Sequence, residues 1–362
     1  MKRIIDSHLD LAWNALSFDR DQTLAVEEIN TQEAAMHDVR GRGNATTSLP
    51  ELRASGVAVC LATILVRANA VKRSAAGFRR TDLDFGHQDI AHAHGHGQLA
   101  YYRLLESRGE MRMLRSQTEL AAHWREWQVD NSESPIGYIL AMEGSDPIVS
   151  IDDAHKWWDA GLRSVMLAHY GPSRYAMGTG QVGPLTEDGR NLLSVFEKLG
   201  MILDLTHLAE PGFFEALDAF SGPVMASHNN CRALVPGDRQ FSDEQLGRLI
   251  ERRAVIGVAL DAWMLLPGWQ RGISQPTEIG LDALADHIDH ICQLAGRIDH
   301  VAIGTDLDGG FGNEQTPREL RRYRDLWELT DILIGRGYSQ KAIDQVFYGN
   351  WLRYFSENLP SL

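Results

Sequence analysis

The chain has 362 residues, with 49 acidic against 35 basic side chains, a formal net charge of −14 and 44% hydrophobic residues. This composition excludes a disordered or fibrous protein, and the negative charge argues against a protein that binds nucleic acid or an anionic membrane. The three cysteines, Cys60, Cys231 and Cys292, are too few and too widely spaced for a disulfide framework or a thiolate zinc site, which favours a cytoplasmic protein.

Short apolar runs rich in β-branched residues alternate with longer stretches of helical periodicity, a pattern typical of βα units and a parallel sheet. The first residues, MKRIIDSHLD, contain no apolar stretch of signal-peptide length, and no run in the chain is long enough to predict a membrane span. The expected strands are residues 3–7, 57–65, 136–142, 164–168, 201–206, 224–227, 255–260 and 301–304. The expected helices are residues 88–106, 117–127, 151–160, 187–199, 213–219, 243–252, 281–294 and 317–335, followed by about two more that end near residue 357.

Eight strands in a chain of this length fit a single (β/α)8 TIM-type barrel over residues 1–362, with extra C-terminal helices at about 317–358 packed on its outside. A doubly wound open sheet uses the same alternation and is the alternative. Polar residues favour the barrel, because six expected strands carry His, Asp or Glu at or just beyond the C-terminal end. These residues are His8, Asp10, Glu143, His169, His207, His228 and Asp306. In a barrel all strand C-termini open onto one face, so we expect these residues to form one site.

The pattern of residue types at these strand ends is that of a metal site. Side chains two apart in a strand point to the same face, so His8 and Asp10 can bind one metal ion. Imidazoles and carboxylates are ligands of zinc and its neighbours, and His207 and His228 end two further strands.

Two metal ions about 3.5 to 4 Å apart need a bridging anion. Many two-metal barrels use a carbamylated lysine as the bridge, but Lys156 and Lys198 fall within helical stretches of this chain. Glu143 is therefore the predicted bridging ligand.

Five motifs in order along the chain, DSHLD, AMEGSDP, LDLTHL, ASHNNCRAL and IGTDLDGG, resemble those of a known family. This is the membrane (renal) dipeptidase family of binuclear zinc peptidases in the amidohydrolase superfamily. The resemblance covers residues 4–310 and is strongest to bacterial members, which lack the secretory signal and lipid-anchor tail of the animal enzyme. Two departures, Glu-Gly-Ser after Met142 and the chain's own loop at 171–183, leave the substrate preference open.

The resemblance implies a role for each site residue. One zinc ion would be held by His8, Asp10 and Glu143, and a second by Glu143, His207 and His228. His169 would contact the substrate and steady the oxyanion, Arg239 would bind the substrate's carboxylate, and Asp306 would handle the proton. From the residues alone, Arg239 is equally well a surface arginine paired with Asp238 or Asp243, and Asp308 competes with Asp306 for the role of base.

The expected function is that of a zinc-dependent metallo-dipeptidase acting on dipeptides with a free C-terminal carboxylate. The family implies tolerance of a D-residue at the C-terminal position, and a homodimer. A hydroxide that bridges two zinc ions would attack the scissile carbonyl. The alternatives are another amide or lactone hydrolase of the superfamily, or a non-catalytic barrel that binds metal.

The densest histidine cluster, HQDIAHAHGH at residues 87–96, is not expected to bind a metal ion. His92 and His96 would lie one turn apart on a helix, but no third ligand is evident. A solvated helix face is the simpler interpretation.

Overall fold

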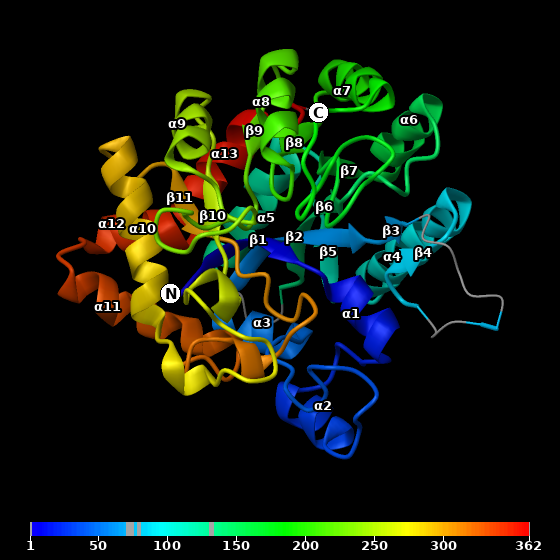
Figure 1. The fold of residues 1–362 in the computed structure, drawn as a ribbon. Helices are drawn as coiled ribbons and strands as arrows, with labels where there is room; N and C mark the ends of the chain where they lie inside the picture. The colour runs from blue at the N-terminus through cyan, green and yellow to red at the C-terminus, as the bar shows by residue number, and fades with distance from the viewer. Residues whose placement is uncertain (1, 70–75, 78–80, 130–133, 362) are drawn as a thin grey trace.

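The computed structural model describes residues 2–69, 76–77, 81–129 and 134–361. Parallel strands form a curled sheet, and helices cover its outer side (Figure 1). The strands are β1 (Ile4–Leu9), β2 (Val57–Leu65), β3 (Arg67–Ala68), β4 (Asp84–Phe85), β5 (Met111–Met113), β6 (Ile136–Glu143), β7 (Leu162–Val165), β8 (Ile202–Asp204), β9 (Val224–Met225), β10 (Ile256–Val258) and β11 (Val301–Ile303). The parallel α/β architecture predicted from the alternation of elements is confirmed.

The strands pair in parallel, which brings their carboxyl ends to one side of the sheet. The main sheet has the order β1-β2-β6-β7-β8-β9, with β5 also paired to β6, and β10 pairs with β11. An isolated parallel bridge between Ala226 and Ile256 links the two sets, and the Asp306 N–H, just beyond β11, donates to His8 O in β1 (3.3 Å). Because these strands are parallel, their carboxyl ends face the same side of the molecule.

Every residue of β2 and β6 is buried. Both faces of these strands are covered, which is why they read as nearly continuous apolar runs rather than as an alternating pattern. β2 has the predicted bounds, and β6 extends one residue beyond the predicted 136–142 to end on Glu143.

The helices are α1 (Leu11–Phe18), α2 (Val26–Glu33), α3 (Leu49–Ser55), α4 (Gln88–Ser107), α5 (Gln117–Val129), α6 (Ile151–Ala160), α7 (Glu187–Leu199), α8 (Glu210–Ala219), α9 (Asp243–Glu251), α10 (Leu281–Ala295), α11 (Leu329–Gly335), α12 (Gln340–Asp344) and α13 (Asn350–Asn358). Helices α6 to α10 follow one another around the outside of the sheet (Figure 1). The bounds of α6 and α7 are those predicted. Each begins with a hydroxyl cap, on Ser150 and Thr186, and ends on a left-handed glycine, Gly161 and Gly200. Among the described residues, no helix combines the length and apolar character needed to cross a membrane.

The prediction of a helix over 317–335 is wrong in its first half. The described chain forms a 3₁₀ segment at Tyr323–Glu328 and reaches α-helix only in α11. Tertiary bonds explain the difference, since the Tyr323 hydroxyl donates to Asp6 (2.6 Å) and its N–H donates to Thr46 O (2.9 Å). These contacts outweigh the helical propensity of the segment.

The chain after α11 packs against the sheet. Trp351 of α13 donates its Nε1–H to Ile303 O in β11 (2.8 Å), and the Tyr354 hydroxyl donates to Val224 O in β9 (2.7 Å). The C-terminal helix is therefore tied to two strands of the fold.

Several predicted strands are longer than those observed. The predicted strand 164–168 is shifted toward the N-terminus, because β7 begins at Leu162 and ends at Val165. The Met166 N–H still donates to Met142 O in β6 (2.9 Å), and the chain then leaves the sheet. In the same way β8, β9 and β10 end before the predicted 206, 227 and 260. The residues that follow these short strands are free to turn toward the site.

Candidate metal centre

The seven residues predicted from strand ends come together at the carboxyl edge of the sheet. His8 lies in β1 and Glu143 ends β6, whereas the others follow their strands within four residues. They are Asp10 after β1, His169 after β7, His207 after β8, His228 after β9 and Asp306 after β11. Six strands that are far apart in sequence therefore contribute to one cluster.

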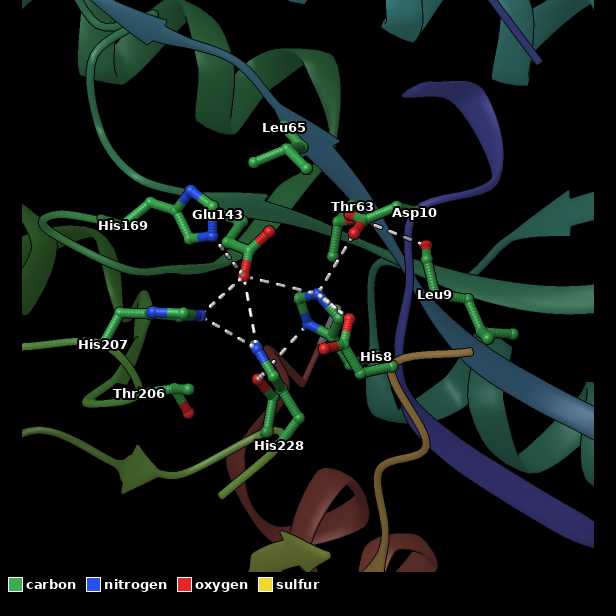
Figure 2. A network of polar contacts seen from close by, with 12 residues as sticks. His8, Leu9, Asp10, Thr63, Leu65, Glu143, His169, Thr206, His207 and His228 are labelled. Carbon is green, nitrogen blue, oxygen red and sulfur yellow. Dashed lines mark hydrogen bonds and ion pairs between the residues drawn. The ribbon is translucent and has the colours of Figure 1, made fainter. Parts of the chain in front are cut away.

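The Glu143 carboxylate lies in the middle of four imidazoles, as Figure 2 shows. Its Oε1 atom is 3.1 Å from Nε2 of His207 and 3.2 Å from Nε2 of His228. The same oxygen is 3.5 Å from Nε2 of His8 and 3.6 Å from Nε2 of His169. One carboxylate oxygen is thus shared by residues from opposite parts of the sheet.

The described residues form three groups of candidate metal ligands, and in each group the ligand atoms lie within 4.8 Å of one another. The groups are His8, Asp10 and Glu143; Glu143, His207 and His228; and His8, His228 and Asp306. The first two are the ligand sets that the family resemblance implies, and they share Glu143. The third brings Asp306 close to His8 of the first group and His228 of the second.

The chemistry of these groups fits metal ions. Nε2 of His8 is buried and has no hydrogen-bond partner among the described residues, although a buried ring nitrogen normally has one. Nε2 of His207 lies only 3.1 Å from Nε2 of His228. Burial lowers the pKa of both these rings well below the usual value, so both are neutral near pH 7, the form in which imidazole binds a metal.

The buried carboxylates of the site also call for positive charge. Burial raises the pKa of Glu143, against the opposing effect of His8. Burial lowers the pKa of His8, but Glu143 and Asp10 outweigh it and raise that pKa well above the usual value. A divalent ion between these groups would offset the negative charge that the protein concentrates here.

Asp306 differs from the other carboxylates because its side chain is 16% exposed and reaches the cavity. Burial raises its pKa well above the usual value, and the nearby Glu143 and Asp10 charges add to this effect, while His8 opposes it. Its backbone is left-handed, with a φ of 58°. Such a conformation in a residue other than glycine persists where surrounding contacts hold it, and it is frequent at functional sites.

Arg239 is buried and braced from two sides. Its Nη1 donates to Asn229 Oδ1 (2.9 Å) and its Nη2 donates to His228 O (2.8 Å). The alternative of a surface arginine paired with a neighbouring acid is wrong, since Asp238 accepts from the Gly180 N–H and Asp243 pairs with His290. Arg239 instead lines the same cavity as Asp10, Glu143 and His207.

This cavity has a volume of about 390 Å³ and includes residues that the sequence analysis missed. They are Trp13, Arg67, Tyr170, Asp261, Trp263 and Arg271. Two of them carry the same signal as the residues that were found, because Arg67 follows β2 by two residues and Asp261 directly follows the predicted strand 255–260. A search of strand ends for arginine as well as for acids and histidine would have included Arg67.

Asp308, the competitor of Asp306 in the sequence, is a structural residue. Its two carboxylate oxygens accept from the backbone N–H groups and the hydroxyls of Thr46 and Thr47, at 2.6 to 3.1 Å. It thereby joins the loop after β11 to the segment before α3.

We predict that Asp308→Asn lowers the free energy of unfolding by about 2 to 3 kcal/mol, because the new amide NH₂ faces backbone N–H donors and the charge-assisted hydrogen bonds are lost. Urea unfolding followed by circular dichroism measures this loss. An unchanged unfolding midpoint and slope would contradict the structural role.

The histidines at 87–96 belong to none of the three ligand groups found among the described residues. His92 Nδ1 contacts Pro147 O (2.8 Å), His94 stacks on Phe85, and His96 stacks on Trp157. His94 and His96 are exposed, which agrees with the solvated helix face expected for this segment.

The comparisons with known proteins cover different shares of the chain. The family model described as membrane dipeptidase (peptidase family M19) matches residues 1–359. A Klebsiella pneumoniae protein, described only as an uncharacterized protein in the pqqA 5′ region, is 30% identical over 209 residues, which are 56% of this chain and 74% of that protein. The dipeptidase tcpJ of Claviceps purpurea is 28% identical over 201 residues, 54% of this chain but 45% of that protein.

Two solved structures share the fold over nearly their full length. One is the dipeptidase AC, a metallopeptidase of family M19, with a TM-score of 0.77 and 21% identity over 100% of this chain and 99% of that chain. The other is a metallopeptidase from Rhodobacter sphaeroides, liganded with a phosphinate mimic of the dipeptide L-Ala-D-Ala, with a TM-score of 0.77 and 22% identity over 99% of both chains. The chain belongs to the membrane dipeptidase family, peptidase family M19, and the sequence-based prediction of a metallo-dipeptidase is confirmed at the level of that family.

Proposed function

We propose that this chain is a binuclear zinc dipeptidase that hydrolyses dipeptides with a free C-terminal carboxylate. The observation that carries the proposal is the position of Glu143 Oε1, which is shared by two ligand groups on either side of it. One Zn²⁺ would be held by His8, Asp10 and Glu143, and the other by Glu143, His207 and His228. Three protein ligands at each ion leave positions open for water and substrate, as catalytic zinc sites require.

When bound, the two ions would lower the pKa of water so that a nucleophile forms near pH 7, and would polarise the scissile carbonyl. The protein's own residues supply the rest. Asp306 lines the cavity and lies 3.8 Å from His8 Nε2. It is placed to take up a proton as the nucleophile forms and to return it to the leaving amine.

His169 lines the same cavity and would supply a hydrogen-bond donor there. Burial, reinforced by the Arg67 and Arg239 charges, lowers its pKa well below the usual value, so the ring is neutral near pH 7. A neutral imidazole with one N–H aimed at the carbonyl oxygen stabilises the charge that develops there during attack.

We predict that Arg239→Met weakens dipeptide binding by about 2 to 5 kcal/mol, because a desolvated guanidinium would lose its pairing with the substrate's carboxylate. A C-terminally amidated dipeptide should be cleaved nearly as well by the variant as by the wild type. Steady-state kinetics on the two substrates, with the metal content measured in parallel, test this. Equal losses on the two substrates would make Arg239 a structural residue that braces Asn229 and His228.

Tolerance of a D-residue at the C-terminal position is part of the proposal. A substrate anchored through its carboxylate and its scissile carbonyl has a less tightly held side chain at that position. The Rhodobacter sphaeroides metallopeptidase of the same fold was liganded with a mimic of L-Ala-D-Ala, which supports an L,D-dipeptide as the first substrate to assay.

A panel of LL, LD, DL and DD dipeptides assayed with the zinc-loaded enzyme tests the function. We expect hydrolysis of LL and LD dipeptides. Strict rejection of L-Xaa-D-Xaa would contradict the stereochemical part of the proposal. If the enzyme hydrolysed lactones or other amides but no dipeptide, the proposed dipeptidase function would be replaced by another reaction of the amidohydrolase superfamily.

We also propose that residues 1–362 form one closed (β/α)8 barrel domain that acts as a homodimer in the cytoplasm. The Ala226–Ile256 bridge and the hydrogen bond from Asp306 to His8 support closure of the barrel. The cysteines Cys60, Cys231 and Cys292 are unpaired thiols, which suits a reducing compartment. Small-angle scattering or sedimentation at several concentrations tests the dimer.

A further inference from the structure

Four imidazoles surround the shared carboxylate, and the partners of their Nδ1 atoms divide them into two kinds. Nδ1 of His207 lies 3.0 Å from Thr179 Oγ1. Ser227 Oγ lies 2.9 Å from Nδ1 of His228 and 3.4 Å from Nδ1 of His8. A hydroxyl accepts as well as donates, so each of these Nδ1 atoms can carry the ring proton and leave the Nε2 lone pair facing the carboxylate.

Thr179 shows this arrangement most clearly. Its hydroxyl donates to His207 O (3.3 Å), so its oxygen lone pairs are available to accept from Nδ1–H of the same residue. The proton of His207 is then on Nδ1, and Nε2 is the acceptor nitrogen, as a metal ligand requires.

His169 differs, because its Nδ1 faces a group that only donates. Arg67 Nη1 lies 3.4 Å from His169 Nδ1, and a guanidinium has five N–H donors and no acceptor. Nδ1 of His169 must therefore accept, and the proton of the neutral ring must be on Nε2. That nitrogen lies 3.6 Å from Glu143 Oε1 and faces the cavity.

The guanidinium is itself held in place. Arg67 and Asp84 are register partners in the short parallel pair β3–β4. Arg67 Nε donates to Asp84 Oδ1 (2.8 Å) and Nη2 donates to Asp84 Oδ2 (2.7 Å), a two-point ion pair that fixes the plane of the guanidinium. The third nitrogen, Nη1, is thereby directed at His169.

We propose that Arg67, clamped by Asp84, is a positioning residue that fixes His169 as an Nε2–H donor and so separates it from the three metal-ligating imidazoles. This inference rests on the proposed hydrolytic function only for the use of that N–H, which would stabilise the developing oxyanion. The positions of the imidazoles agree with this separation. His169 Nε2 is nearly as close to Glu143 as His8 Nε2 is, yet His169 belongs to none of the ligand groups among the described residues.

The direct test is the protonation pattern of the ring by nitrogen NMR. Zinc-loaded enzyme labelled with ¹⁵N in its histidine side chains distinguishes protonated from unprotonated ring nitrogens, and the signals missing in His169→Asn assign the ring. We expect an unprotonated Nδ1 and a protonated Nε2 for His169. Arg67→Met should convert this pattern to a mixture of both tautomers. The matched control is Arg271→Met, which removes another cavity arginine whose ion pair is with Asp261, and it should leave the pattern unchanged.

A proton on Nδ1 of His169 in the wild type, or an unchanged pattern in Arg67→Met, would overturn the proposal. Because this measurement needs no substrate, its failure is separate from a failure of the proposed dipeptidase function. If Arg67→Met does not fold, Asp84→Asn loosens the same clamp and should also mix the tautomers.

Kinetics give a second readout. Arg67→Met should lower kcat by about 10- to 100-fold. Deleting an oxyanion donor outright typically costs about 10²- to 10³-fold, and the loss here should be smaller because the His169 ring remains. KM should change by less than about threefold and the metal content should not change. Arg67→Lys, which keeps a cationic donor, should restore most of kcat. A raised KM with normal kcat, or loss of metal that lysine does not relieve, would instead assign Arg67 to substrate binding or to the fold.

Discussion

Asp306→Asn should lower kcat for dipeptide hydrolysis by about 10²- to 10⁴-fold, the range typical of a general acid–base residue. The substitution keeps the shape of the side chain but removes its ability to take up and return a proton. Two ligand groups are complete without Asp306, so the fold and the metal content should be nearly intact. KM should change less than kcat, which steady-state kinetics on one L,D-dipeptide would show.

The matched control for this experiment lies two residues away. Asp308→Asn makes the same chemical change at a carboxylate held by Thr46 and Thr47. It should lower stability while the folded protein keeps kcat within about tenfold of the wild type. Asp306→Asn kinetics within about tenfold of the wild type would remove Asp306 from the mechanism.

Glu143→Gln should abolish the binding of both metal ions together, because one carboxylate oxygen serves both ligand groups. A neutral amide cannot bridge two cations in the same way. Hydrolysis should fall by more than about 10³-fold, since water then keeps a pKa near 15.7 instead of about 7. Elemental analysis of the purified variant, prepared under zinc-replete conditions, measures the metal loss directly.

Asp146→Asn is the control for Glu143→Gln. Asp146 is also a buried acid, three residues further along, but it accepts from the Ala68 N–H (2.8 Å) and the Ser173 hydroxyl (2.6 Å). Its substitution should leave both metal ions bound. A Glu143→Gln protein that keeps one tightly bound metal ion would show that the two sites do not depend on a shared ligand.

Sequence reasoning was most successful where one physical rule applied along the whole chain. Parallel strands present their carboxyl ends on one side, so residues at or just beyond the ends of β6, β8 and β9 could be assigned to a common site before any distance was known. The same rule extends to Asp261 and Arg67, which the sequence analysis left out. The role proposed for Arg67 depends on its contact with His169, 102 positions later, and no local pattern encodes that contact.

Local propensity failed where tertiary contacts decide the backbone. Residues 317–322 have a helical pattern but are not helical, because Tyr323 and Arg324 are held by bonds to Asp6 and Glu51 in other parts of the fold. Helices α1, α2 and α3 have only seven or eight residues each, and β3 and β4 have two. Elements this short carry too few residues for a periodic signal.

The choice between Asp306 and Asp308 as the catalytic base also depends on tertiary contacts that the local sequence does not encode. Both residues follow β11 and both have a left-handed backbone, with φ values of 58° and 62°. Only their partners differ, since Asp308 is enclosed by threonine donors and Asp306 opens to the cavity. The threonine partners of Asp308 come from the segment before α3, which is far away in sequence.

The most direct test of the binuclear dipeptidase is a metal titration of the purified chain with hydrolysis of an L,D-dipeptide measured in the same samples. The protein is stripped with a chelator and reloaded with increasing zinc, and bound metal is counted by elemental analysis. We predict saturation at two zinc ions per chain, with full hydrolytic activity only near that ratio. Saturation at one ion or none, or two bound ions without dipeptide hydrolysis, would contradict the proposed function.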